Sequence, residues 1–179
     1  MAKKALLVID VQEGIVGRPG IHDADGVMKE IRGLQDRARK AGAPVLFMQH
    51  DGPKGHCVEK GSAGWAIHPS VRPADGETVL NKEASDSFFQ TFLQQELKQL
   101  GVSEVVIAGC MTQYCVDTTC RRAVTLGFDV ILASDAHTTA DEGGLTAQQI
   151  IKHHNTLLSG FAAGGHEITV MKSSEVSFE

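Results

Sequence analysis

The chain has 179 residues, of which 42% are hydrophobic and 22% are charged, and its formal net charge is −5. These values are typical of a single globular domain, residues 1–179, with a substantial core. The acidic balance excludes the usual nucleic-acid binders, and no apolar run approaches the roughly 18 residues that a transmembrane helix needs.

The first predicted element is a buried strand near the N-terminus. Leu6 to Ile9 is a continuous apolar run, which is typical of a strand covered on both faces. Asp10 stands where this strand emerges, and Gln12 follows it. Ligands of open parallel sheets bind beyond the carboxyl ends of the strands. Asp10 is therefore either a site residue or the start of a turn, and Gln12 is a candidate substrate contact.

A helix and a second strand follow. Apolar residues at helical spacing predict a helix over residues 26–41, capped by Asp25. The run 45–48 predicts the next strand, which gives a right-handed β-α-β unit. Residues 50–77 form a long irregular region, which we interpret as a lid or pocket wall because it carries the single tryptophan, Trp65. His50 lies at the strand's end and is a candidate ligand contact.

Strands and helices continue to alternate in the second half of the chain. We expect strands over 78–80, 105–108, 130–133 and 168–170, helices over 88–100, 114–126 and 145–161, and a polar loop over 134–139. This alternation predicts one three-layer α/β/α domain in which helices cover both faces of a doubly wound parallel sheet.

The segment 105–126 contains a strand, a tight turn and a helix, with Cys115 in the first helical turn. Free N–H groups and the positive helix end favour a thiolate at such a position, and the same N–H groups can hold an oxyanion. A cysteine in a core helix is also often an inert apolar filler. This stretch alone leaves both interpretations open.

The cysteine spacing argues against zinc and disulfides. The chain has no Cys-x-x-Cys pair, so we expect free thiols in a reducing compartment, with no cofactor and no bound metal. The N-terminal stretch Met1 to Lys4 lacks the small-residue cleavage site of a secretory signal, which favours a cytoplasmic location. The four cysteines are Cys57, Cys110, Cys115 and Cys120.

Asp10, Lys82 and Cys115 each lie just beyond the end of a predicted strand. All carboxyl ends of a parallel sheet meet at one edge, so these side chains can converge. A carboxylate can accept the thiol proton, and an ammonium lowers the thiol pKa and stabilises the charges. The trio is therefore a candidate hydrolytic site.

Five segments together resemble the isochorismatase-like cysteine hydrolase superfamily, which includes nicotinamidases and N-carbamoylsarcosine amidohydrolases. The resemblance covers nearly the whole chain. Its segments are LLVIDVQ (6–12), GWAIHPSV (64–71), NKEASDSFF (81–89), GCMTQYCVDTTCRRA (109–123) and VILASDA (130–136).

The resemblance implies a six-stranded parallel sheet, a homodimer or homotetramer, and hydrolysis of a small-molecule amide or carbamoyl-type C–N bond. Asp10 would be the base, Lys82 its cationic partner and Cys115 the nucleophile that forms a thioester. The N–H groups of Met111 and Cys115 would form the oxyanion hole. A non-proline cis peptide is implied between Cys110 and Met111.

Two departures from the family pattern bear on the substrate. Nicotinamidases carry Asp-x-His after the second strand, whereas Asp51 is followed by Gly52 and Pro53, so we expect no catalytic metal. Isochorismatases that cleave a vinyl ether lack the cysteine, which favours acyl chemistry here. Trp65 and Phe88 are candidate apolar walls for a small planar substrate.

Two alternatives from the sequence remain. One is isochorismatase-type ether hydrolysis, and the other is a non-catalytic binding protein on the same scaffold. A doubly wound nucleotide binder is a weaker option, because the turn at 109–112 has no glycine-rich phosphate loop.

Overall fold

The computed structural model describes residues 3–179. Met1 and Ala2, part of the stretch considered for a secretory signal, lie outside the described residues. Among the described residues, no helix combines the length and the hydropathy needed to cross a membrane.

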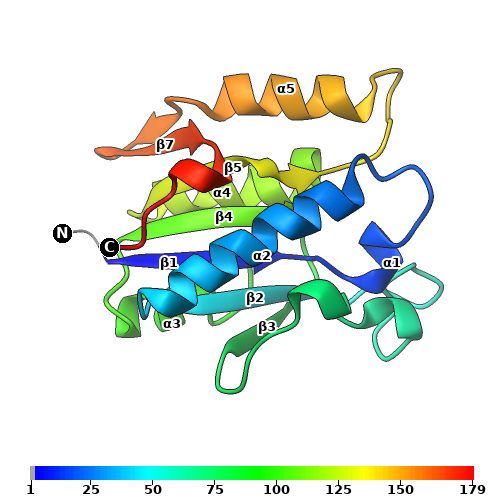
Figure 1. The fold of residues 1–179 in the computed structure, drawn as a ribbon, viewed down its shortest axis with the longest axis horizontal. Helices are drawn as coiled ribbons and strands as arrows, with labels where there is room; N and C mark the ends of the chain where they lie inside the picture. The colour runs from blue at the N-terminus through cyan, green and yellow to red at the C-terminus, as the bar shows by residue number, and fades with distance from the viewer. Residues whose placement is uncertain (1–2) are drawn as a thin grey trace.

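A mostly parallel sheet lies at the centre of the chain, with strand order β3-β2-β1-β4-β5-β7-β6 (Figure 1). The predicted α/β class is confirmed, but the described residues form seven strands rather than six. The additional strand is the two-residue β6, which pairs antiparallel with β7. The strands are β1 (Lys4–Ile9), β2 (Val45–His50), β3 (Thr78–Lys82), β4 (Glu104–Cys110), β5 (Asp129–Thr138), β6 (Ala162–Ala163) and β7 (His166–Met171).

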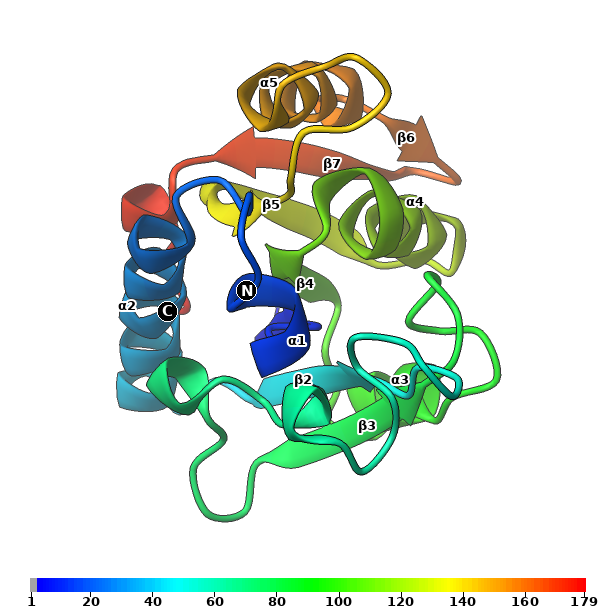
Figure 2. The same cartoon turned by 90° about the vertical axis from the view of Figure 1, so that its right-hand side faces the viewer.

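Helices cover both faces of this sheet, as the alternating pattern predicts (Figure 2). Helix α2 lies on one face and α3 and α4 on the other, while α5 runs beside β7. The α-helices are α1 (Glu13–Val16), α2 (Ala24–Lys40), α3 (Leu93–Gln99), α4 (Asp117–Thr125) and α5 (Ala147–Leu158).

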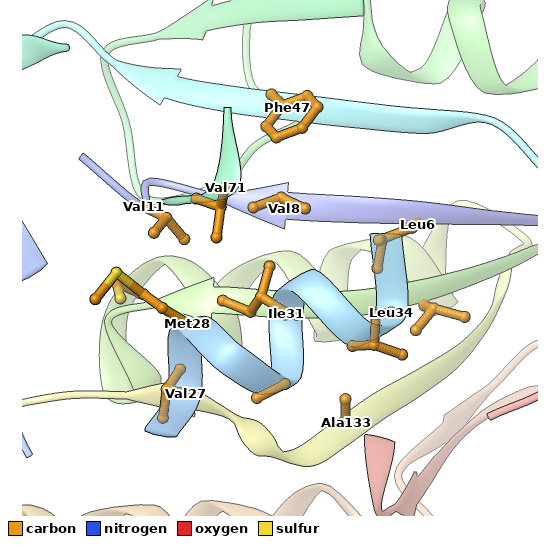
Figure 3. Close-up of a cluster of buried hydrophobic side chains, with 14 of the residues drawn as sticks. Leu6, Val8, Val11, Val27, Met28, Ile31, Leu34, Phe47, Val71 and Ala133 are labelled. Atoms are coloured by element: carbon orange, nitrogen blue, oxygen red, sulfur yellow. The ribbon is translucent and has the colours of Figure 1, made fainter. Parts of the chain in front are cut away.

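The core on the α2 face follows directly from the apolar stripe of that helix. Ile31 and Leu34 are fully buried against Leu6 and Val8 of β1 and Phe47 of β2 (Figure 3). Each fully buried side chain of this size contributes about 1.5–3 kcal/mol to folding. This packing fixes β1 in the middle of the sheet, where its end is surrounded by neighbouring strands.

Several predicted boundaries are wrong, including that of the helix expected over 145–161, which spans Ala147–Leu158. Helix α2 begins at Ala24, with Asp23 rather than Asp25 at the cap position. The helix expected over 88–100 spans only Leu93–Gln99, and Phe89 and Phe92 are exposed. The loop expected over 134–139 is mostly strand, because β5 continues to Thr138.

Strand β5 reaches this length through an irregularity beside β4. Ile107 pairs with Leu132, but Gly109 pairs with His137, so β5 has extra residues between the two pairs. Such a bulge re-aims the side chains that follow it. The end of β5 is thereby brought next to the end of β4, where the turn carrying Cys115 begins.

Candidate active site

Asp10 is held at the carboxyl end of β1 in a left-handed conformation, with φ 51°. Its N–H donates to the Met48 carbonyl at 3.0 Å, and its side chain is buried. The neighbouring strand approaches closely at Gly109, where a Cβ atom would lie 2.0 Å from the Ile9 carbonyl oxygen. Glycine is therefore required beside Asp10 for the two strand ends to pack.

Lys82 ends β3, and its side chain is completely buried. Its Nζ lies 2.7 Å from Asp10 Oδ2, 3.2 Å from Cys115 Sγ and 2.8 Å from the Ala84 carbonyl oxygen. An ammonium has three N–H donors, so these three acceptors match its full capacity. Burial alone would lower the pKa of Lys82, but the Asp10 carboxylate and the hydrogen bonds to Asp10 and Cys115 outweigh burial and raise it. Lys82 is thus a fixed cation.

Cys115 lies in a π-helical turn, Thr112–Val116, that joins β4 to α4. The Val116 N–H donates to the Met111 carbonyl at 3.3 Å, five residues back. The peptide bond between Cys110 and Met111 is cis. Single π turns are frequent at functional sites. Here the turn directs the Cys115 sulfur toward Lys82 and the end of β1.

The thiol of Cys115 is protonated at rest. Burial has the largest effect on the pKa of Cys115, and the Asp10 carboxylate acts in the same direction. Together they raise this pKa to about 12. Lys82 lowers the pKa of Cys115, in the direction expected from the sequence, but burial and Asp10 have the larger effect. The sulfur becomes a strong nucleophile only when a neighbouring base takes its proton.

Asp10 and Cys115 share a cavity of about 430 Å³ at this edge of the sheet. Such a volume suits a small molecule. Lys82 contacts both residues from behind the cavity wall. The lining consists of Asp10, Ile15, Arg18, His50, His56, Cys57, Ser85, Met111, Tyr114, Cys115, Ala140, Asp141 and Glu142.

The structure places His50, a candidate ligand contact, and Met111, a candidate oxyanion-hole residue, in this lining. Burial and the nearby Lys82 charge lower the pKa of His50, so its imidazole is neutral at neutral pH. The ring of His50 lies 5.9 Å from that of His56, measured between centroids. A neutral imidazole can both donate and accept a hydrogen bond to a substrate.

Three other candidate substrate contacts lie elsewhere. Gln12 is buried, and its amide bonds to the backbone of His50 and to the Trp65 carbonyl. The Trp65 indole donates to Asp51 at 2.7 Å, so it fixes the loop instead of forming an apolar wall. Phe88 packs in the core against Phe128, with centroids 6.0 Å apart. These side chains support the site from outside the cavity.

Several lining residues were not predicted. His56 and Cys57 are both exposed and line the cavity from the loop after β2. The segment that carries them packs closely against Gly14. A Cβ atom at Gly14 would lie 2.0 Å from the Cys57 carbonyl oxygen, so only glycine allows this contact. Glu142, also in the lining, accepts hydrogen bonds from Tyr114 and Gln113, both at 2.6 Å. Ligands of parallel sheets bind beyond the carboxyl ends of the strands, and residues 139–145 follow β5 at that edge. Their position in the sequence could therefore have indicated them as lining residues.

Asp51, which the sequence resemblance places at the start of the nicotinamidase metal box, is bound here by protein donors. Its oxygens accept hydrogen bonds from Lys60 Nζ at 2.6 Å, Trp65 Nε1 at 2.7 Å and Asn81 Nδ2 at 2.8 Å. Within residues 3–179, no group of three or more His, Cys, Asp or Glu side chains is arranged to hold a metal ion. The three hydrogen bonds from Lys60, Trp65 and Asn81 make Asp51 an organising residue for the loop.

Residues 4–159 match the isochorismatase domain family. The chain belongs to the isochorismatase family. This confirms the resemblance drawn from the five sequence segments, and it agrees with the observed order of strands and helices.

Relatives of this isochorismatase-family chain include proteins with named activities. It is 40% identical over 139 residues to a streptothricin hydrolase of Streptomyces noursei, an alignment that covers 77% of this chain and 55% of the relative. The chain therefore matches only about half the length of the streptothricin hydrolases. It is 29% identical over 152 residues to nicotinamidase 3 of Arabidopsis thaliana, covering 77% of this chain and 74% of that protein.

A solved structure shows the same fold over almost the whole chain. The N-carbamoylsarcosine amidase of Thermoplasma acidophilum superposes with a TM-score of 0.81 at 26% sequence identity. The superposition covers 97% of this chain and 98% of that protein.

Proposed function

We propose that this chain hydrolyses an amide or carbamoyl-type C–N bond of a small molecule through a thioester on Cys115. The observation that carries the proposal is that Lys82 Nζ lies 2.7 Å from Asp10 Oδ2 and 3.2 Å from Cys115 Sγ. Relatives named as a nicotinamidase and an N-carbamoylsarcosine amidase support C–N hydrolysis. The streptothricin hydrolases support a hydrolase, although the chain matches only about half of their length.

The first half of the reaction forms the thioester. As the substrate carbonyl approaches, Asp10 takes the proton from the Cys115 thiol, and the sulfur attacks the carbonyl carbon. The backbone N–H groups of Met111 and Cys115 would stabilise the oxyanion. Protonated Asp10 then gives its proton to the leaving nitrogen, the C–N bond breaks, and ammonia or an amine departs.

The second half regenerates the enzyme. Asp10, again a carboxylate, takes a proton from a water molecule, whose oxygen attacks the thioester carbonyl. The C–S bond breaks, the sulfur recovers its proton from Asp10, and the acid is released. The net reaction consumes one water for each C–N bond, and Asp10 ends in its initial state.

Lys82 remains a cation throughout this cycle. Its raised pKa and its three fixed acceptors make it unsuitable as a proton carrier. Its charge instead lowers the energy of the sulfur anion as the thiol loses its proton. Lys82 therefore favours the transition state over the resting thiol without exchanging protons itself.

The test is a screen of small amides, ureas and carbamates for release of ammonia or amine. Cys115→Ala should lower turnover of any active substrate by about 10⁴-fold or more, because it removes the nucleophile. Cys120→Ala is the matched control, since Cys120 is buried in the core on α4. It should retain turnover within about threefold, as expected for a change outside an active site.

The outcomes separate the alternatives. Unchanged C–N hydrolysis by Cys115→Ala contradicts the thioester route. Cleavage of a vinyl ether that survives this substitution supports the ether-hydrolase alternative. Ligand binding by the wild type, without turnover of any substrate in the screen, supports a binding protein.

A further inference from the structure

The structure contains a buried polar chain below the turn that carries Cys115. It starts at Thr112, the first residue of the π-helical turn, passes through His137 of β5 and ends at Asn155 of α5. Thr112 is fully buried and His137 is 1% exposed. The bulge in β5 is what brings His137 opposite Gly109, directly beside the end of β4.

The hydrogen bonds of this chain have a defined direction. Asn155 Nδ2 donates to the Ser134 carbonyl at 3.0 Å, so its Oδ1 faces His137 as an acceptor. His137 Nε2 lies 2.9 Å from that oxygen and must carry the proton. His137 Nδ1 is then an acceptor, and the Thr112 hydroxyl, 2.9 Å away, donates to it. Burial lowers the pKa of His137 to about 4, which agrees with a neutral ring.

The end of β5 is also tied to His22, which lies just before α2. The Thr138 hydroxyl donates to the His22 carbonyl at 2.5 Å, and the His22 N–H donates to the Thr139 carbonyl at 2.9 Å. His137 therefore belongs to a rigid segment rather than to a free loop. A hydrogen bond from Thr112 to such a segment fixes the start of the π-helical turn.

We propose that His137, oriented by Asn155, is a positioning residue that anchors Thr112 and so holds Met111 and Cys115 in place beside Asp10 and Lys82. The expected effect of His137 on turnover rests on the proposed hydrolase function. Its expected effect on the position of the Cys115 thiol does not. Thr112 lies next to Met111 and three residues before Cys115, so a displacement at Thr112 moves both. A shift of about 1 Å at a nucleophile lowers turnover by roughly 100-fold.

The test uses substitutions that remove or keep single hydrogen bonds. Thr112→Val removes the hydroxyl with little change in shape, and Thr112→Ser keeps it. His137→Gln can keep a donor toward Asn155 but loses the acceptor toward Thr112, whereas His137→Asn can keep that acceptor. Thr156→Val is the control, since the Thr156 hydroxyl lies exposed on α5 and bonds only within its own helix, to the Lys152 carbonyl.

Two readouts are measured on each folded variant. The first is the rate of iodoacetamide alkylation of Cys115 against pH, located by peptide mass spectrometry, with exposed Cys57 as internal reference. The second is kcat and KM on the best substrate from the screen. Thr112→Val and His137→Gln should move the alkylation midpoint toward that of an ordinary thiol and lower kcat by about 10- to 100-fold, with KM within about threefold.

Thr112→Ser and His137→Asn should keep the alkylation midpoint of Cys115 and kcat close to the wild-type values. The control, Thr156→Val, should match the wild type. Wild-type alkylation midpoints in Thr112→Val and His137→Gln would overturn the proposal, whether or not a substrate has been found. Equal losses in all four network variants would also overturn it, because the individual hydrogen bond would then not matter. A wild-type chain without hydrolase activity would refute the proposed function only, since the alkylation profiles still decide the positioning role.

Discussion

Asp10 and Asp51 occupy equivalent places in the fold and differ in what surrounds them. Each directly follows one of two neighbouring parallel strands, β1 and β2, and each binds a lysine, at 2.7 Å for Asp10 and 2.6 Å for Asp51. Asp51 also accepts hydrogen bonds from Trp65 and Asn81. Asp10 instead lies beside the Cys115 thiol at a cavity wall.

This difference shows how donor count separates a structural carboxylate from a reactive one. Burial tends to raise the pKa of Asp51, but its three hydrogen bonds outweigh burial and lower it, so that carboxylate is a poor base. Within residues 3–179, Asp10 has a single cationic partner, Lys82, which also touches the nucleophile. Residue type and position in the sheet are the same, and the neighbouring side chains decide the role.

The largest expected effect comes from removing the charge of each aspartate in turn. Asp10→Asn should lower kcat by about 10³-fold or more, because the amide cannot accept the thiol proton. Asp51→Asn should lower kcat by less than about tenfold, since Asp51 acts only through the loop. Steady-state kinetics on the best substrate measures both. Equal losses in the two variants would mean that the roles are not separate.

A second prediction concerns how the stability of the chain depends on pH through the buried neutral His137. Burial holds the pKa of His137 near 4, well below its ordinary value of 6.5. The unfolded chain therefore binds more protons between pH 6.5 and 4, and stability falls as the pH falls through this range. The expected loss is about 3 kcal/mol across the window. Urea denaturation at fixed pH steps measures it, and His137→Asn should flatten the curve between pH 6.5 and 4.

A moderate effect is expected on the loop that Asp51 holds. Asp51→Asn leaves the Trp65 and Asn81 donors with a weaker acceptor and should destabilise the chain by about 1–3 kcal/mol. Because Trp65 is the only tryptophan, its fluorescence reports directly on this site. We expect a red-shifted emission under native conditions in this variant. Unchanged emission together with unchanged urea stability would show that Asp51 does not fix the loop.

The smallest effect should come from Lys60, the exposed partner of Asp51. Its side chain is 65% exposed, whereas that of Lys82 is completely buried. Exposed ion pairs are weakened by solvent and by salt. Lys60→Met should therefore shift the Trp65 emission and the urea midpoint less than Asp51→Asn does. A larger effect than that of Asp51→Asn would place the anchor of the loop at Lys60.

The fold class and the convergence of Asp10, Lys82 and Cys115 follow from the sequence for a simple reason. Continuous apolar runs identify strands buried on both faces, and all parallel strands end at one edge. A residue directly after such a run must therefore lie near that edge. No side-chain detail is needed for this inference.

The remaining features depend on tertiary contacts that periodicity does not record. The polar segment Ser134 to Thr138 lacks an apolar run, yet pairing across a bulge makes it strand and buries His137. Trp65 ends a single 3₁₀ turn, Ala63–Trp65, which is too short to leave a periodic pattern in the sequence. The pKa of Cys115 depends on burial and on Asp10, which become known only when the strands are placed together.

The most direct test of the central claim is to trap the enzyme during turnover. The wild-type chain, mixed with an active amide and quenched in acid, should gain the mass of the acyl group on the peptide that contains Cys115. The adduct should appear faster than product accumulates in steady state and disappear when substrate is exhausted. Steady hydrolysis with no adduct at Cys115, or with an adduct on another residue, would contradict a thioester formed beside Asp10 and Lys82.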